Sequence, residues 1–359
     1  MSNFFKLGTL TRIRTGELDA NASSENGQYP FFTCSKEPLR IDSYSYDCEC
    51  VLVAGNGDLN VKYFDGKFDA YQRTYIIESV DKSKLLVKYL YFFLDIYVEV
   101  LRTQSIGGVI KYIKLGNLTD ALIPLPSIER QAEIIECLEK CNTLIDKRQR
   151  QIALMEQLVK SRFIELFGNE KNRMVMSDVC SIITDGTHQP PKFKSEGIPF
   201  IFVSNITEDR LTYDAEKYID QETYDELIKR TPVEIGDVLL STVGSYGHAA
   251  VVRTDKKFLF QRHIAYLKPR KELIDSDYLH GAILSPDAQE QIEKAVKGIA
   301  QKTINLSEIK KIVIPVPSMD RQKGFAAFVA QVDKSKLAVQ KGLQELETLK
   351  KSLMQQYFG

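Results

Sequence analysis

The chain has 359 residues, with 48 Lys and Arg against 48 Asp and Glu, so its formal net charge is zero. This balance excludes a polybasic protein that coats nucleic acid by bulk charge, although it allows a local basic face. Hydrophobic residues make up 43% and charged residues 27%, which is typical of a globular protein that buries a core. The length is enough for two ordinary domains or one large one.

Cysteine usage indicates neither a disulfide framework nor a structural metal site. Six cysteines are too few for a disulfide scaffold in a chain of this length. Cys48 and Cys50 are separated by one residue, and Cys137 and Cys141 share one face of a predicted helix. Neither pair has a second cysteine pair or a histidine pair near it, so we expect reduced thiols and no bound metal.

No segment has the pattern of a membrane or targeting sequence. The N-terminus contains no apolar stretch of signal-peptide length. The most apolar segment, residues 89–101, contains Asp95 and Glu99 and is too short to span a bilayer, so it is predicted to be a buried amphipathic helix. We therefore expect a cytoplasmic protein with no membrane partner.

The strongest pattern in the chain is an internal repeat. Residues 121–131 read ALIPLPSIERQ and residues 312–322 read IVIPVPSMDRQ, an offset of 191 residues (312 less 121). The match continues without a gap to the Phe-Gly pairs at 167–168 and 358–359. Solenoid repeats have periods of about 20–50 residues, so this much longer offset indicates that a whole domain has been duplicated.

Further matches precede this segment, with small changes of offset that indicate loop insertions. The matching pairs are Tyr89 with Tyr278, Gln72-Arg73 with Gln261-Arg262, Gly107 with Gly298, and Lys111 with Lys302. Each copy begins with strand-like runs, such as VLVAG at 51–55, continues with a helix around the matched tyrosine, and reaches a Pro-x-Pro break. Asp65-Gly66 lies between apolar runs and predicts a hairpin turn, with Asp255-Lys256 at the equivalent place.

A helix of roughly 40 residues is predicted to end each copy, spanning about 60 Å. Ser127 and Ser318 suit N-caps, and Glu129 and Asp320 place a carboxylate in the first turn. Apolar residues recur at seven-residue intervals in both helices: Leu138, Ile145, Ile152 and Val159 in the first, and Val332, Val339, Leu346 and Leu353 in the second. This period predicts that the two helices form an antiparallel coiled coil, with two unrelated amphipathic helices as the alternative.

The catalytic motifs of nucleic-acid enzymes are missing from the sequence. There is no glycine-rich cofactor loop with an Asn/Asp-Pro-Pro-aromatic motif for methyl transfer, and no phosphate-binding P-loop. The four histidines form no metal-binding pair. Asp65-Gly66-Lys67 resembles half of a metal-dependent nuclease motif, but Asp, Gly and Lys are also ordinary turn residues. We therefore expect a binding and scaffolding protein with no catalytic residues.

These features together resemble the specificity subunit of type I restriction–modification systems, over nearly the whole chain. The second copy carries the stronger motifs: ITDGTHQPPKF, GIPFIFVSNI, GDVLLSTVGSYGHAAVV, QRHIAYLKP and KGIAQKTINLSEIKKIVIPVPSMDRQ. The first copy carries weaker versions: YPFFTCS, CVLVAGNGDLN and SIGGVIKYIKLGNLTDALIPLPSIERQ. Each piece alone is unspecific, and the specific signal is their order, which occurs twice.

The resemblance implies an α+β fold with two target recognition domains, at residues 1–123 and 169–314. These are mixed β-sheets with small helices, and each precedes a long spacer helix, at 124–168 and 315–359, in a pseudo-two-fold repeat. It further implies a noncatalytic subunit whose domains each read one half of an asymmetric, bipartite double-stranded DNA target. Two methyltransferase subunits would bring S-adenosylmethionine and adenine methylation, and restriction subunits would bring ATP- and Mg²⁺-dependent cleavage. This chain would hold no cofactor.

Candidate DNA-binding residues are polar and basic side chains in predicted loops, because base edges and phosphates are contacted by such groups. In the first copy they are Arg12, Arg14, Lys36, Asn56, Lys62, Tyr71, Arg73 and Lys111. In the second copy they are His188, Gln189, Lys192, Lys194, Asn205, Ser245, Tyr246, Arg262 and Lys302. A duplication preserves structure more readily than readout, so a structural pairing with a carboxylate stays an alternative for Arg73 and Arg262.

Charge counts also limit how the chain can hold DNA. Residues 1–120 contain 14 basic and 15 acidic side chains, and residues 169–311 contain 20 and 22. Each recognition domain must therefore gather its basic residues on one face, and we expect partner subunits to neutralise much of the phosphate charge. Two other hypotheses remain open: a structural coiled-coil adaptor that does not read DNA, and a self-contained methyltransferase or nuclease with unrecognised motifs.

Overall fold

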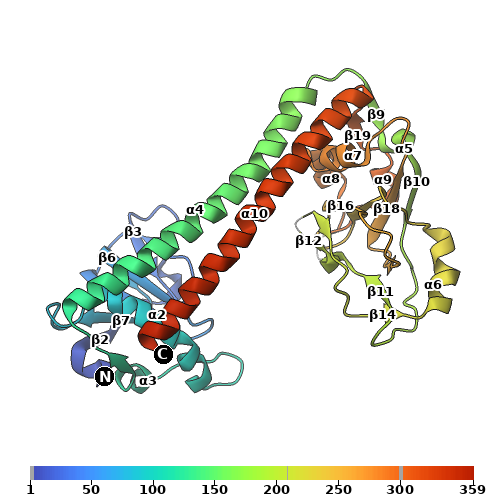
Figure 1. Cartoon of the computed structure of the whole chain (residues 1–359). Coiled ribbons are helices and arrows are strands. Elements are labelled where there is room, and N and C mark those ends of the chain that lie inside the picture. The colour runs from blue at the N-terminus through green and yellow to red at the C-terminus, as the bar shows by residue number, and fades with distance from the viewer. Residues whose placement is uncertain (1–3, 208, 299–301) are drawn as a thin grey trace. The chain divides into compact units, whose positions relative to one another are not determined.

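The computed structural model describes residues 4–207, 209–298 and 302–359. The chain divides into two compact units, one of residues 1–149 with 340–359 and the other of residues 150–339. Two long helices, α4 (Ile128–Phe167) and α10 (Met319–Phe358), contribute one part to each unit (Figure 1). Each unit therefore combines a mixed α/β domain with segments of both helices.

The first unit is built on a six-stranded sheet in the order β2-β7-β5-β6-β3-β4. Neighbouring strands are antiparallel, except that β3 and β6 are parallel. The strands are β2 (Thr11–Thr15), β3 (Tyr29–Phe32), β4 (Leu39–Ile41), β5 (Tyr46–Ala54), β6 (Val61–Ala70) and β7 (Thr74–Ser79). Side chains alternate along β5, so Val51 and Val53 enter one apolar cluster while Cys50 and Leu52 enter another on the opposite face.

One face of this sheet is covered by the helix α2 (Val87–Gln104), whose Tyr89, Leu90 and Leu94 are fully buried. The apolar segment at 89–101 lies inside this helix, as predicted. The remaining elements of the unit are β1 (Phe4–Lys6), α1 (Leu7–Leu10), η1 (Ala20–Ala22), α3 (Leu115–Thr119) and β8 (Leu122–Pro124), with β1 and β8 paired. Within the described ranges, none of the helices is both long and apolar enough to span a bilayer.

The second unit contains a four-stranded sheet in the order β10-β18-β15-β16 and a smaller one in the order β14-β11-β17. Its strands are β9 (Arg173–Val175), β10 (Cys180–Asp185), β11 (Ile198–Ile201), β12 (Ile206–Thr207), β13 (Arg210–Leu211), β14 (Tyr218–Ile219), β15 (Val238–Ser241), β16 (Ala249–Val251), β17 (Leu259–Phe260), β18 (Ile264–Pro269) and β19 (Val313–Pro315). Its helices are α5 (Met176–Val179), η2 (Val203–Asn205), α6 (Gln221–Leu227), η3 (Ile228–Arg230), α7 (Ser276–Ile283), α8 (Pro286–Ala295) and α9 (Leu306–Ile309).

The two units repeat one topology. The order β2-β7-β5-β6 of the first recurs as β10-β18-β15-β16 in the second. β16 and β17 together correspond to the long strand β6, so the parallel pair β3 and β6 recurs as β11 and β17. The terminal pair β1 and β8 recurs as β9 and β19. The hydroxyl of Tyr89 donates to the carbonyl oxygen of Pro124 at 2.9 Å, and that of Tyr278 donates to Pro315 at the same distance. The predicted domain duplication and α+β fold are therefore confirmed.

The long helices begin where their caps predict, immediately after Ser127 and Ser318. The hydroxyl oxygen of Ser127 accepts a hydrogen bond from the backbone N–H of Arg130 at 3.3 Å. The pKa of the Glu129 carboxyl is lowered by a bond from its own backbone N–H and then by the Ser127 hydroxyl. Both interactions stabilise a helix start that carries free N–H groups.

Within each unit the segments of α4 and α10 run antiparallel. In the second unit the rings of Phe163 and Phe325 lie 5.3 Å apart, and Glu156 pairs with Lys336. Residue numbers thus rise along one helix as they fall along the other. In the first unit the guanidinium of Arg130, near the start of α4, lies 5.7 Å from the ring centre of Tyr357, near the end of α10. The antiparallel pairing predicted for these helices is therefore present in both units.

The apolar residues predicted at seven-residue intervals, which we call the apolar stripe, are removed from solvent wholly or in part on both helices. Leu138 and Val339 are buried. The other members are half-buried: Ile145, Ile152, Val159, Val332, Leu346 and Leu353. Lys336 interrupts the stripe of α10, and only 8% of its surface is exposed. The second unit therefore carries a buried cation in an otherwise apolar helix contact.

The hairpin turn predicted at Asp65-Gly66 is wrong. Both residues lie inside the ten-residue strand β6, where Asp65 pairs with Glu49 and Gly66 pairs with Cys48 of β5. Pairing with a nine-residue neighbour outweighs the local turn preference of an Asp-Gly pair. The turn between β5 and β6 falls earlier, at residues 55–60.

Candidate nucleic-acid interface

One end of each sheet anchors the long helices through a buried glutamine. In the first unit the side-chain oxygen of Gln131 accepts from the N–H of Leu86 at 3.0 Å, and its amide nitrogen donates to the carbonyl oxygens of Lys84 and Pro126. In the second unit Gln322 makes the same three bonds, with the N–H of Asp275 and with the carbonyl oxygens of Leu273 and Pro317. The matched glutamines of the repeat thus fix each helix start to its sheet.

The opposite end of each sheet carries four neighbouring loops, which we call the loop edge. In the first unit it consists of residues 16–19, 55–60, 71–73 and 105–113. In the second it consists of residues 186–189, 242–248, 261–263 and the described residues from 296 to 303. The N–H of Gly57 donates to the carbonyl oxygen of Lys111 at 2.9 Å, and the N–H of Gly244 donates to that of Lys302 at 3.1 Å. The two loop edges therefore share one backbone framework.

The loops that contain the two matched lysines are closed in the same way. Ile106 and Tyr112 exchange two backbone hydrogen bonds of 3.0 and 2.8 Å. Lys297 and Thr303 exchange two of 2.9 Å. Residues 299–301 of the second loop lie outside the described part of the chain. The repeated loops expected around Lys111 and Lys302 thus occupy equivalent places.

Most of the candidate DNA-binding residues lie on these loop edges. In the first unit they are Asn56, Tyr71, Arg73 and Lys111. In the second they are His188, Gln189, Ser245, Tyr246, Arg262 and Lys302. Lys36 adjoins the first loop edge, where its amine lies 3.8 Å from Asp58. Lys62 reaches it from β6 by donating to the side-chain oxygen of Asn60, and burial lowers the pKa of its amine.

Other candidates lie elsewhere or are engaged within the fold. Arg12 and Arg14 lie on β2, and Arg14 forms an ion pair with Glu78 at 2.9 Å. The guanidinium of Arg14 also lies 4.7 Å from the ring centre of Tyr46. The amine of Lys194 lies 3.6 Å from Asp220. Exposed Lys192 is in the loop that follows Gln189.

Asn205 does not present its side chain for DNA contact, because it is only 6% exposed. Its side-chain oxygen accepts from the N–H of Phe202 at 3.0 Å, and its nitrogen donates to the carbonyl oxygen of Asp214 at 2.9 Å. A buried amide must satisfy its hydrogen bonds internally. Asn205 is therefore a structural residue that holds the segment around β12 and β13.

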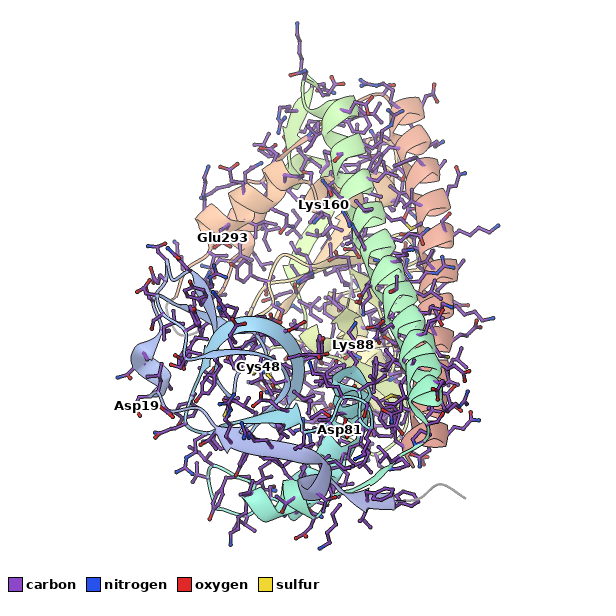
Figure 2. All side chains as sticks on the ribbon, turned by 90° about the vertical axis from the view of Figure 1, so that its left-hand side faces the viewer. Asp19, Cys48, Asp81, Lys88, Lys160 and Glu293 are labelled. Atoms are coloured by element: carbon purple, nitrogen blue, oxygen red, sulfur yellow. The ribbon has the colours of Figure 1, made fainter. Side chains whose placement is uncertain are left out.

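The alignment of the repeat is wrong by one residue at the turns before β7 and β18. The N–H of Gln72 donates to the carbonyl oxygen of Leu18, and the N–H of Arg262 donates to that of Thr187. The carbonyl oxygen of Arg73 accepts from Gly55, and that of His263 accepts from Thr242. Gln72 is thus equivalent to Arg262, and Arg73 to His263. The amide of Gln72 also donates to Asp19 at 2.9 Å, and Figure 2 labels Asp19.

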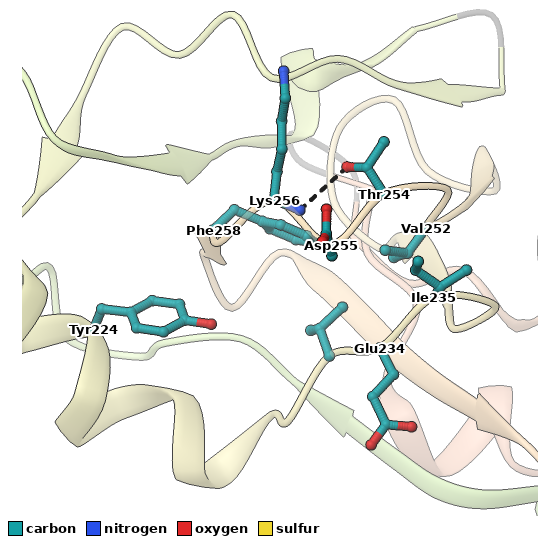
Figure 3. Close-up of a pocket in the computed structure, with 9 residues that line it drawn as sticks. Tyr224, Glu234, Ile235, Val252, Thr254, Asp255, Lys256 and Phe258 are labelled. Atoms are coloured by element: carbon teal, nitrogen blue, oxygen red, sulfur yellow. Dashed lines mark hydrogen bonds between the residues drawn. The ribbon is translucent and has the colours of Figure 1, made fainter.

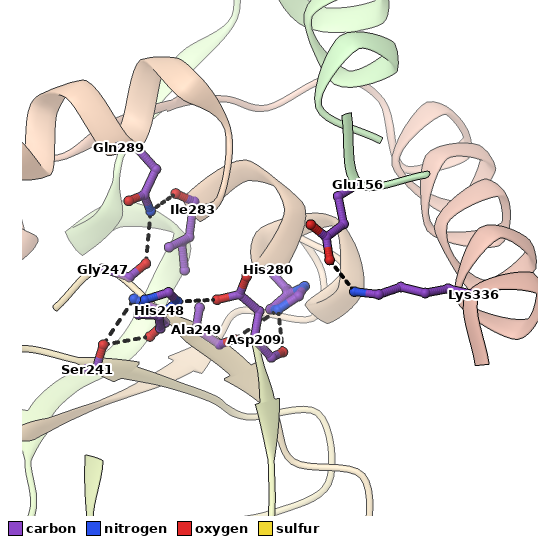
Figure 4. Close-up of polar contacts among 10 residues, drawn as sticks. All are labelled: Glu156, Asp209, Ser241, Gly247, His248, Ala249, His280, Ile283, Gln289 and Lys336. Atoms are coloured by element: carbon purple, nitrogen blue, oxygen red, sulfur yellow. Dashed lines mark hydrogen bonds and ion pairs between the residues drawn. The ribbon is translucent and has the colours of Figure 1, made fainter. Parts of the chain in front are cut away.

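Ion pairs between distant segments shape the second loop edge. The carboxylate of Asp185 lies 2.5 Å from the guanidinium of Arg230 and 2.9 Å from Nε2 of His188. Asp209 lies 2.9 Å from Nδ1 of His248, and Figure 4 shows the two side chains pointing toward each other. Sequence reasoning missed the pairs of Asp185 with Arg230 and of Asp209 with His248, because their partners lie 45 and 39 residues apart and no local pattern indicates them.

Lys302 is held by neighbouring groups in the second loop edge. Its amine lies 3.3 Å from Glu293 of α8 and 5.8 Å from the ring centre of Tyr246. The Tyr246 hydroxyl also donates to Glu293. These bonds, first from Tyr246 and then from Lys302, lower the pKa of the Glu293 carboxyl. Tyr246 and Lys302 therefore form a defined surface feature of this loop edge.

A cavity of about 430 Å³ lies in the second unit, between α6 and residues 252–258 (Figure 3). Tyr224 and Phe258 supply its aromatic lining, and Glu234 and Asp255 supply carboxylates. Lys256 also lines it, so the lining carries charges of both signs and shows no preference for the phosphate backbone. Within the described ranges, no cluster of three or more His, Cys, Asp or Glu side chains has the arrangement of a metal site.

Comparison with known proteins identifies relatives of both copies. The family model described as "Type I restriction modification DNA specificity domain" matches residues 2–157 and 170–349. The EcoDI specificity subunit of Escherichia coli is 37% identical over 155 residues, which cover 43% of this chain and 34% of that protein. The EcoBI specificity subunit of the same species is 22% identical over 346 residues, which cover 86% of this chain and 73% of that protein.

Two solved structures share the fold. The type I restriction–modification S subunit of M. genitalium aligns with a TM-score of 0.61 at 16% identity, covering 100% of this chain and 96% of that chain. A chain from a study of the assembly and conformational transition of the type I R-M system aligns with a TM-score of 0.59 at 17% identity, covering 99% and 97%. Because the family model spans both copies, this chain belongs to the family of type I restriction–modification DNA specificity domains, which confirms the resemblance of its sequence.

Proposed function

We propose that this chain is the noncatalytic specificity subunit of a type I restriction–modification complex, and that its two loop edges each read one half of a bipartite DNA target. The observation that carries this proposal is the repetition of one loop framework with different side chains. The bonds from Gly57 to Lys111 and from Gly244 to Lys302 hold equivalent loops in place. A shared framework with different side chains suits two related but unequal half-sites.

The target is asymmetric because equivalent positions carry different chemistry. Gln72 of the first unit corresponds to Arg262 of the second, and Arg73 corresponds to His263. Amides, guanidinium groups and imidazoles match different patterns of donors and acceptors on base edges. One palindromic target would require equal side chains at these positions. Lys111 and Lys302 are the same residue type, which suits contact with the uniform phosphate backbone.

The long helices set the separation of the half-sites and provide a docking surface for two methyltransferase subunits. Exposed leucines on α4 and α10 support the docking role: Leu144 and Leu349 in the first unit, and Leu154, Leu158 and Leu337 in the second. Leu154 and Leu158 are one helical turn apart and therefore lie on the same face of α4, and such adjacent exposed apolar side chains support a surface that a partner covers. The partners supply S-adenosylmethionine and adenine methylation, and the restriction subunits supply ATP- and Mg²⁺-dependent cleavage.

The deciding experiment is methylome sequencing of cells that express a methyltransferase partner with and without this chain. The proposal predicts methylated adenines in one two-part motif with a fixed gap, present only when the chain is expressed. A single short palindrome, or no chain-dependent motif, contradicts it. The alternative of a structural coiled-coil adaptor predicts that the chain assembles with its partners but that no methylation motif depends on it. The enzyme alternative predicts that the purified chain alone binds S-adenosylmethionine or cuts DNA with Mg²⁺.

Deleting residues 318–359 is not a clean test of partner docking. Phe325 lies in the core of the second unit, and Met354 and Phe358 lie in the core of the first. Removing α10 would therefore damage both domains as well as the helix pair. Replacing the exposed Leu154 and Leu158 by glutamate is the sharper test, because it changes only the surface. We expect this double variant to fold but to lose co-purification with the methyltransferase.

A further inference from the structure

The turn between β6 and β7 has a backbone fixed at every residue. The N–H of Tyr71 donates to Phe32 at 2.9 Å, and the N–H of Gln72 donates to Leu18 at 2.9 Å. The carbonyl oxygen of Arg73 accepts from Gly55 at 2.7 Å. All three residues of the turn therefore have defined positions before any ligand binds.

The turn before β18 in the second unit is fixed by equivalent bonds. The N–H of Gln261 donates to Ile201 at 3.1 Å, and the N–H of Arg262 donates to Thr187 at 3.0 Å. The carbonyl oxygen of His263 accepts from Thr242 at 2.9 Å. The two turns thus place three side chains in the same way, although the side chains differ.

A glycine lies against each turn and allows this close approach. A Cβ atom built on Gly16 would lie 2.0 Å from the carbonyl oxygen of Ala70, and one built on Gly186 would lie 2.2 Å from that of Phe260. Both distances are far below van der Waals contact with a backbone atom. In both copies of the repeat, the turn therefore packs closely against a glycine of a preceding loop.

The arginines of these turns differ from the structural arginines of the same domains. Arg14 pairs with Glu78 and Arg230 pairs with Asp185. Within the described residues, the exposed guanidinium groups of Arg73 and Arg262 make no hydrogen bond or ion pair. An arginine that stabilises the fold has a partner in it, either a carboxylate, as these two have, or backbone carbonyl oxygens, as Arg40 has in Gly27 and Gln28. The fixed backbone and the unengaged guanidinium together favour a role in binding.

We infer that the turns 71–73 and 261–263 are base-reading elements, and that Arg73 and Arg262 each contact one guanine in the major groove. This inference rests on the proposed function. A guanidinium group donates two parallel hydrogen bonds to O6 and N7 of guanine, a pattern that no other base offers in the major groove. Because the backbone of the turn is already fixed, less conformational entropy is lost when the arginine binds a base.

The inference predicts a guanine at one defined position in each half-site. Because Arg73 corresponds to His263 and Arg262 to Gln72, the guanidinium lies one residue earlier in the second turn. The guanines of the two half-sites should therefore occupy different positions relative to their domains. The two half-sites would then differ because the arginine lies one residue earlier in the second turn than in the first.

The test uses the full chain with its methyltransferase partner and compares methylation motifs. Arg73→Lys keeps the charge but replaces the planar fork of parallel N–H donors by a single ammonium group, so we expect discrimination at one guanine of the first half-site to fall about 5- to 150-fold. Arg262→Lys should do the same in the second half-site. In each variant the other half-site serves as the control. Arg270→Lys, at the residue that follows the far end of β18, should leave both unchanged.

A second measurement uses binding of the complex to duplexes in which one guanine is replaced by 7-deazaguanine, which lacks N7. The wild type should bind one such duplex per half-site more weakly, and Arg73→Lys should be insensitive to the change in the first half-site. A wild-type motif without guanine in a half-site, or unaltered motifs in both lysine variants, overturns the inference. A wild type that yields no two-part motif instead overturns the proposed function.

Discussion

The ring of Phe358 packs against the ring of Tyr89 in the first unit, with centroids 5.0 Å apart. In the second unit Phe167 packs against Tyr278 at 5.1 Å. The aromatic residue that ends each long helix therefore completes the core of the unit in which the other helix begins. The helices are thus integral parts of both units.

Phe358→Ala should destabilise the first unit by about 3–5 kcal/mol, because it removes a buried ring and leaves a cavity. Phe167→Ala should have a similar effect on the second unit. Leu349→Ala is the matched control on α10, since Leu349 is 49% exposed and its loss should cost about 0.5 kcal/mol or less. Urea unfolding of the purified chain measures these differences. Equal stability of Phe358→Ala and Leu349→Ala would disprove the role of the ring in the core.

The ion pair of buried Lys336 and half-exposed Glu156, with 2.5 Å between amine and carboxylate, should lose different amounts of stability depending on which partner is replaced (Figure 4). Glu156→Gln leaves a buried ammonium group without its counterion. We expect a loss of about 1–2 kcal/mol, below the full cost of breaking a buried pair because Glu156 is half-exposed. Lys336→Ile should be neutral or stabilising, since it removes the cost of burying the charge.

The first copy supports this choice, because Ile145 occupies the position equivalent to Lys336 (336 less 191). A double-mutant cycle over the two sites gives the interaction energy. Adding Glu156→Gln to Lys336→Ile should cost almost nothing. A cost equal to that of Glu156→Gln alone would mean that the ion pair does not connect the two helices.

The long helices and the duplication could be predicted from the sequence because their signals are local or periodic. The helices begin immediately after Ser127 and Ser318, as expected, and the apolar residues at seven-residue intervals are buried or half-buried. The loops have no period, so the repeat could not be aligned to the residue at Gln72. Asp65-Gly66 became part of a strand through pairing with a distant segment.

The candidate site could be predicted only in part, because the contacts that decide it join segments distant in the sequence. Polar residue type placed Arg73 and Arg262 among the candidates, but the same criterion selected the buried Asn205. The pairing of Arg14 with Glu78 and of Arg230 with Asp185 depends on tertiary contacts. Whether a polar side chain stabilises a fold or remains available to a ligand is decided by such contacts, which the sequence order does not show.

Gly16→Ala and Gly186→Ala should disturb the turns at the loop edges. The added methyl group would overlap the carbonyl oxygens of Ala70 and Phe260, so we expect a loss of about 1–3 kcal/mol in stability. Gly16→Ala should also weaken recognition of the first half-site more than the second. The matched control is Gly342→Ala, on α10 in the first unit and away from the loop edge, where an added Cβ meets no atom within 4 Å.

Thermal unfolding and methylome sequencing together test these glycine variants. If Gly16→Ala displaces the turn, it should lower the melting temperature and change the methylation of one half-site, while Gly342→Ala should do neither. If Gly16→Ala and Gly342→Ala behave alike, the close approach of the turn to Gly16 is not required.

Cys48 on β5 should react with alkylating reagents at a lower pH than an ordinary thiol (Figure 2). A hydrogen bond from the Cys50 thiol lowers the pKa of Cys48, and the charge of Arg14 adds to this effect. The thiolate is the reacting form, so the rate of iodoacetamide labelling should rise through a midpoint below the usual pKa of about 8.5. Burial raises the pKa of Cys180 to about 12, so Cys180 should remain unlabelled in the folded protein.

Cys50→Ala removes the hydrogen bond and should move the midpoint for Cys48 upward, toward the value of a free thiol. Cys34 provides an internal reference in the same unit, because it is also half-buried and is separate from this pair. Mass spectrometry of labelled peptides across a pH series measures the three thiols in one experiment. An unchanged midpoint for Cys48 in the Cys50→Ala variant would show that Arg14, and not Cys50, controls the charge of this thiol.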